Sequence, residues 1–111
     1  MDWKALVMSL STIALSAHPK TRAIAPYVGP AVTMTEELFT PKTGQTKKER
    51  RAAKLANAVG LVKIAIASTN AMKPGTVDDA VSDRLIENSI SVVVDGANLL
   101  HRSPIADLPA A

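Results

Sequence analysis

Two long runs of apolar residues at helical spacing constrain the fold of this chain more than any other feature. The first run lies in a predicted helix over about 47–71, where at ~100° per residue one face carries Leu55, Val59, Val62 and Ile66. The second lies in a predicted helix over about 77–101, on a stripe of Ile86, Ile90, Val93, Ala97 and Leu100. The short connection between them makes the two helices antiparallel neighbours. We therefore predict an all-α fold built on an elongated antiparallel helical hairpin, each helix ~37 Å long at ~1.5 Å per residue.

Two shorter helices are predicted before the hairpin. Asp2 can accept hydrogen bonds from the free amides of a first turn, so a helix is expected over about 3–17. His18 precedes a proline and is therefore pushed out of the helical region, which ends this helix. The next helix is expected over about 30–39, because Pro30 is tolerated in a first turn and removes a hydrogen bond inside a helix.

Turn-forming residues divide and end the helical segments. Proline, glycine and polar residues together predict an internal loop over 40–45. Thr46 and Glu49 then have the spacing of a capping box, in which each end residue satisfies a free amide of the other. A Ser-Pro pair ends the last helix and leaves 103–111 as an extended C-terminal tail. We expect the whole chain, 1–111, to form a single helical domain.

The composition argues against catalysis and metal binding. The chain has no cysteine, which removes disulfides, thiolate nucleophiles and cysteine-based zinc sites together. Its two histidines, His18 and His101, are far apart in the sequence and have no cluster of carboxylates around them. We therefore predict a protein that is not an enzyme, with no catalytic residue, no metal ligand and no cofactor.

Charge is distributed unevenly along the predicted hairpin. The segment from Lys42 to Lys54 has a net charge of +5 and contains a basic patch of Lys47, Lys48, Arg50, Arg51 and Lys54. The segment from Val77 to Asp95 has a net charge of −4 and contains an acidic patch of Asp78, Asp79, Asp83 and Glu87. Such complementary charges can steer pairing within a chain or between subunits. In a simple hairpin the acidic patch would be left facing another partner.

The first long helix also carries apolar residues away from its main face. Leu61 and Ile64 point to the opposite side, and a helix that is apolar around most of its circumference is buried on more than one face. We therefore expect Leu61 and Ile64 to contact another element of the chain or, as a protein interface, another subunit of a homo-oligomer or a larger assembly. On the second long helix, Asp95 and Asn98 are the polar residues expected to be buried and to set the register of a helix interface.

Two other functions are kept as alternatives. The first predicted helix could lie in a membrane surface, with Trp3, Leu6 and Leu10 as candidate contacts in a peripheral or lysis-associated protein. The basic segment 42–54 could bind nucleic acid weakly, although no aromatic residue lies within it for base stacking. Neither a signal peptide nor a run of about 20 apolar residues is predicted.

Four segments together carry a resemblance to known proteins: the opening Met1-Asp2-Trp3-Lys4-Ala5-Leu6-Val7, the stretch from Ile24-Ala25-Pro26 to Glu36-Glu37-Leu38-Phe39, the Gly44-x-x-Lys47-Lys48 helix start, and the stripe from Ile86 to Asn98. They resemble small helical proteins that tailed bacteriophages encode among their virion or lysis genes. The resemblance implies no catalytic residue. It implies a virion-associated accessory or assembly protein, found in the host cytoplasm or in the virion, that acts through helix–helix self-association or partner binding.

Overall fold

The computed structural model describes residues 2–38, 44–77 and 81–102, and all regular structure within these ranges is helical. The helices are α1 (Trp3–Ser16), α2 (Pro19–Arg22), α3 (Ala25–Leu38), α4 (Lys47–Met72) and α5 (Asp83–Arg102). The predicted all-α class is therefore confirmed. The predicted tail over 103–111 and residues 40–43 of the predicted loop lie outside the described residues.

The ends of α1 and α4 follow the capping chemistry expected from the sequence. Asp2 accepts a hydrogen bond from the amide of Ala5 at 2.9 Å, and Thr46 accepts one from the amide of Glu49 at 3.1 Å. The Thr46 hydroxyl also donates to the Glu49 carboxylate at 3.1 Å. Both helices begin within a residue of the predicted position because a side-chain oxygen replaces the missing backbone partner.

The region between α1 and α4 is more helical than predicted. Pro19 starts the short helix α2, which the sequence analysis missed, and His18 caps it by accepting a hydrogen bond from the amide of Lys20 at 3.1 Å. Helix α3 begins at Ala25 rather than at residue 30, because Pro26 lies in the first turn, where no donor is needed. Pro30 is therefore inside the helix, which is a correction to the prediction that it begins one.

Helix α5 begins later than predicted, at Asp83 rather than near residue 77. Ser82 provides the first-turn partner, since its hydroxyl accepts a hydrogen bond from the amide of Leu85 at 3.1 Å. Val77 is held back against the end of α4, where the Asn70 side chain accepts from its amide at 2.9 Å and donates to its carbonyl at 3.0 Å. Val77 is buried, so its place in the core keeps it out of the following helix.

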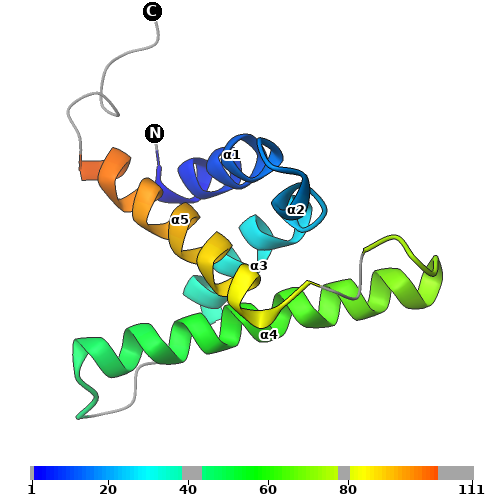
Figure 1. The fold of residues 1–111 in the computed structure, drawn as a ribbon. Coiled ribbons are helices and arrows are strands. Elements are labelled where there is room, and N and C mark those ends of the chain that lie inside the picture. Colours follow the sequence, from blue (N-terminus) through cyan, green and yellow to red (C-terminus); the bar gives the residue numbers. More distant parts are fainter. Residues whose placement is uncertain (1, 39–43, 78–80, 103–111) are drawn as a thin grey trace, which may run out of the picture.

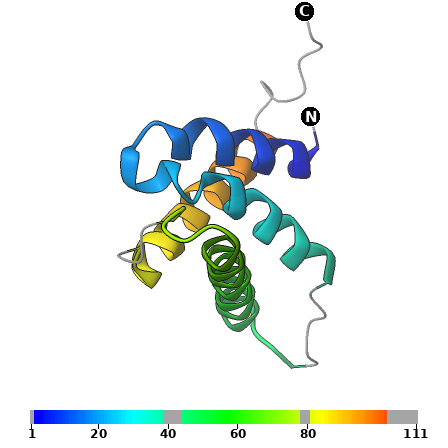
Figure 2. The ribbon, with the colours of Figure 1, turned by 90° about the vertical axis from the view of Figure 1, so that its right-hand side faces the viewer.

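The two long helices cross obliquely and do not lie side by side along their lengths (Figure 1). Helix α1 packs against α3 and α5, while α4 packs against α3 and α5 from another side. When α4 is viewed nearly end-on, α3 lies between α1 and α4, and α5 runs behind them (Figure 2). The molecule measures 44 × 43 × 20 Å, a flattened body. An elongated hairpin of the two long helices is not confirmed.

The predicted apolar faces do form the core. The buried members of the two seams are Val59, Val62, Ile86, Ile90, Val93 and Ala97. The remaining seam residues, Leu55, Ile66 and Leu100, are partly buried against the same cluster. The core also takes in α1 and α3, which contribute Leu6, Val7, Leu15, Ala25, Val28, Ala31 and Val32. The stripe of α5 is thus covered by three helices and not by α4 alone.

Helices α1 and α3 meet at an unusually close contact between Ser11 and Gly29. The buried Ser11 hydroxyl donates to the carbonyl of Ala25 at 2.6 Å and accepts from the amide of Gly29 at 3.0 Å. A Cβ atom at Gly29 would lie 2.9 Å from the sulfur of Met8 and 3.1 Å from the Cβ of Ser11. A side chain at this position would press on Met8 and Ser11, so the close approach favours glycine.

We predict that Gly29→Ala destabilises the fold by about 1–2 kcal/mol, because the added methyl group forces α1 and α3 apart. Gly60→Ala is the matched control, since a Cβ atom at Gly60 in α4 meets nothing within 4 Å. It should stabilise the fold by ~0.5–1 kcal/mol, the helix-propensity difference between the two residues. Urea denaturation followed by circular dichroism measures both changes. Equal effects at the two positions would contradict the close contact.

Candidate functional site

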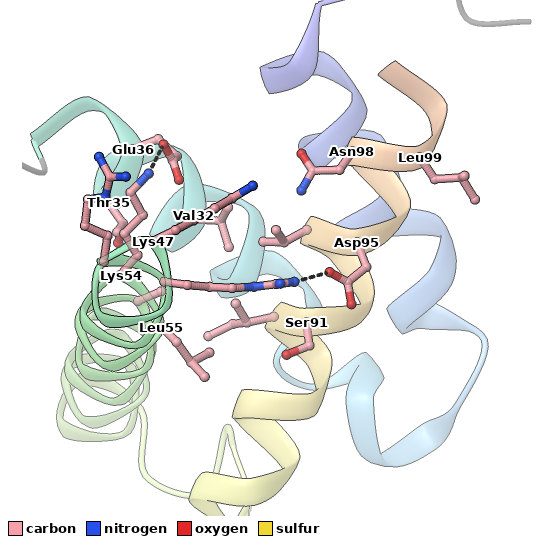
Figure 3. Close-up of a pocket in the computed structure, with 15 residues that line it drawn as sticks. Val32, Thr35, Glu36, Lys47, Lys54, Leu55, Ser91, Asp95, Asn98 and Leu99 are labelled. Atoms are coloured by element: carbon pink, nitrogen blue, oxygen red, sulfur yellow. Dashed lines mark hydrogen bonds and ion pairs between the residues drawn. The ribbon is translucent and has the colours of Figure 1, made fainter. Parts of the chain in front are cut away.

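An open groove of about 700 Å³ lies between α3, α4 and α5. Its deepest lining residues are apolar and buried, namely Val32, Ala58 and Ile90. Leu55 and Val94 are partly buried and also line it. Figure 3 shows side chains of all three helices directed toward this space. Its α4 residues come from the first half of that helix, 47–58, and its α5 residues come from 90–99.

One wall of the groove is cationic. Four residues of the predicted basic patch line it, at one-turn spacing along a single face of α4: Lys47, Arg50, Arg51 and Lys54. Lys48, the fifth predicted residue, is exposed and does not line the groove. The structure therefore brings most of the patch to one surface and adds an apolar floor that the sequence analysis missed. Lys47, Arg51 and Lys54 lie on one side of the predicted helix, and this spacing is the sequence feature that indicates a common cationic surface.

Two of the four cations are paired with carboxylates from the neighbouring helices. Arg51 contacts Asp95 of α5 at 2.9 Å, and this ion pair spans the groove (Figure 3). Lys54 contacts Glu36 of α3 at 3.0 Å. Within the described residues, Lys47 and Arg50 have no carboxylate partner. The groove consequently has a cationic edge that no carboxylate of the described ranges neutralises.

The two polar residues predicted for the helix interface have different environments. Asn98 is partly buried and accepts a hydrogen bond from the indole nitrogen of Trp3 at 2.7 Å, which joins α5 to α1. Asp95 is a correction, because its side chain is 60% exposed and serves the ion pair with Arg51. The apolar stripe of α5 faces away from Asp95, so a carboxylate is tolerated there without burial.

The described residues of the predicted acidic patch, Asp83 and Glu87, have different environments. Asp83 contacts Lys63 of α4 at 3.2 Å, so part of the patch is paired within the chain and does not face another partner. Glu87 is exposed. Asp78 and Asp79 lie outside the described residues. The long helices thus neutralise each other in part, as the complementary charges of the sequence indicated.

The two predicted interface residues on α4 separate in the structure. Leu61 is partly buried and packs against the core, so it contacts another element of the same chain. Ile64 is 64% exposed. Where α4 crosses the other helices, they contact more of its circumference than the predicted seam. Leu61 lies within this contact and Ile64 lies outside it.

The candidate membrane contacts are engaged with the rest of the protein. Leu6 is buried, and Trp3 and Leu10 pack partly against the core. Leu10 is also close to α5, since a Cβ atom at Gly96 would lie 3.1 Å from its Cδ1. The described part of the chain contains one helix long and apolar enough to cross a membrane, α4. The sequence analysis had not expected a membrane span there, because Lys63 interrupts the apolar stretch from Ala56 to Ala67.

Within the described ranges no group of three or more His, Asp or Glu side chains is arranged to hold a metal ion. No protein-family model, curated protein or solved structure matches the chain. The site is therefore characterised by its own geometry, which is an apolar groove beside a row of cations.

We predict that the Arg51–Asp95 ion pair contributes little to stability, because both side chains are mostly exposed. A double-mutant cycle of Arg51→Ala and Asp95→Ala should give a coupling energy of about 0.2–1 kcal/mol, measured by urea denaturation in low salt. The coupling should fall further at high ionic strength. A coupling of several kcal/mol would mean that the pair is an essential part of the fold.

Proposed function

We propose that the protein is a non-enzymatic helical assembly protein that acts through self-association or through binding to other subunits. The observation that supports this most is the coverage of α4. Only three of its 26 residues are buried, Ala58, Val59 and Val62, although the helix carries apolar residues around most of its circumference. A second molecule would cover the surface that the chain leaves open.

The exposed apolar residues on α4 give this proposal a specific location. Ile64 is 64% exposed and Met72 is 89% exposed. The C-terminal end of α4 projects beyond the other helices (Figure 1), so a partner could approach it from several sides. The resemblance to bacteriophage proteins is consistent with a virion-associated accessory role in the host cytoplasm or the virion.

Membrane association is a second candidate, favoured by the length and apolarity of α4. A core helix of a water-soluble protein satisfies the same criterion, and α4 begins with a cluster of charges. In this structure the first helix does not support the peripheral mode, because Trp3, Leu6 and Leu10 pack against the protein. Flotation of the full chain with anionic vesicles would support this candidate, and failure to float would remove it.

We predict that Ile64→Gln weakens self-association. Burial of one isoleucine side chain is worth about 1.5–3 kcal/mol, so the dissociation constant should rise by roughly tenfold to a hundredfold. The helical content should not change, because the side chain is exposed in the protomer. Sedimentation velocity at micromolar concentration and circular dichroism measure the two quantities.

Ile13→Gln is the matched control, because Ile13 on α1 is 71% exposed and carries the same side chain. This variant should associate as the native chain does. If the native chain is a monomer that recruits no partner from its native particle or lysate, the proposed function is wrong. If both variants dissociate alike, α4 is not the interface.

A further inference from the structure

We propose that the groove between α3, α4 and α5 binds an acidic amphipathic segment of a partner protein. The inference rests on the proposed partner-binding function but concerns another surface, since Ile64 lies ten residues beyond Lys54 and does not line the groove. The partner segment must have one apolar face beside a row of carboxylates.

The floor of the groove accounts for the apolar face of such a segment. Val32, Ala58 and Ile90 close its base, so an inserted leucine-like side chain would contact apolar atoms from three helices. Leu99 lies at the edge and is 72% exposed, which extends the apolar surface toward solvent. The groove is open along this side, so a chain segment can lie in it without being threaded.

The cationic wall of the groove would bind the carboxylates of the partner segment. Lys47 and Arg50 are unpaired within the described structure and lie three residues apart, ~4.5 Å along the axis of α4. Two acidic side chains three residues apart on a partner helix have the same separation along its axis. Docking would remove water from the groove and so strengthen these charge pairs.

The Arg51–Asp95 ion pair can be replaced by an ion pair between Arg51 and the partner. Both side chains are mostly exposed, so the pair is weakly held. A carboxylate from the partner can take the place of Asp95 at the Arg51 guanidinium while Asp95 returns to solvent. Removal of the Asp95 charge should therefore favour the partner.

The same groove fits nucleic acid less well. The described residues of its lining include no aromatic side chain on which a base could stack. Val32, Ala58 and Ile90 are apolar, so they offer no hydrogen-bond partner to a phosphate or a sugar. The proposal therefore commits to a protein segment, and single-stranded DNA and anionic vesicles serve as competing probes.

The test uses the full chain and a fluorescein-labelled helical probe peptide with leucines along one face and glutamates at one-turn spacing beside them. Its counterpart has lysine at each glutamate position. Fluorescence anisotropy should show binding of the acidic probe only. Lys47→Glu with Arg50→Glu should weaken it by about tenfold or more, equivalent to about 1.4 kcal/mol.

Lys20→Glu with Lys73→Glu is the matched control, because it makes the same change in net charge at exposed residues on α2 and after α4. It should leave binding within about twofold. Asp95→Asn should strengthen binding, an effect that a merely structural role for the ion pair does not predict. Leu99→Ser should weaken binding without loss of helical content, because Leu99 is exposed.

Equal losses in the two charge-reversal pairs would overturn the proposal, since they would reflect net charge and not the groove. So would an unchanged or weaker affinity of Asp95→Asn, or binding of single-stranded DNA or anionic vesicles in the groove in place of the acidic probe. Ile64→Gln separates this proposal from the previous one, because it should weaken self-association and leave probe binding intact. If the native chain assembles through Ile64 but does not bind the acidic probe, the groove proposal is wrong and the proposed assembly function stands.

Discussion

The contact between Ser11 and Gly29 is the constraint on which the arrangement of the helices depends. Without a side chain at Gly29, α1 approaches α3 closely enough for the Ser11 hydroxyl to bridge the carbonyl of Ala25 and the amide of Gly29. The joined pair then covers α5 from one side, where Trp3 donates to Asn98. Because α1 and α3 cover so much of the apolar stripe of α5, α4 can only cross it.

This crossing explains why the molecule has both a groove and an under-covered helix. A long helix that meets its neighbours obliquely contacts them over a few turns, and α4 accordingly buries three residues. The groove lies between the first half of α4 and α5. Residues of α3 line its base, and its other side is open to solvent. The cations of α4 project into that opening, partly balanced by Glu36 and Asp95.

Several features could be predicted from local sequence because they depend on neighbouring residues. The starts of α1 and α4 follow from Asp2 and Thr46, whose oxygens bond to amides three residues away. The buried faces of α4 and α5 follow from their periodicity, and Val62 and Val93 are fully buried. The start of α5 could not be predicted from the acidic residues before it, because Val77 is held in the core by Asn70.

The sequence by itself determined the helical class, the apolar seams and the one-sided row of cations, since each depends on spacing along a single helix. The tertiary structure alone decided which helices meet. Leu61 was reached by the core and Ile64 was not, although both lie off the main seam, because exposure depends on the crossing of α4 and not on its periodicity. The apolar floor of the groove is likewise a tertiary feature. Val32, Ala58 and Ile90 come from three helices and become neighbours only when the glycine contact has set the positions of α1 and α3.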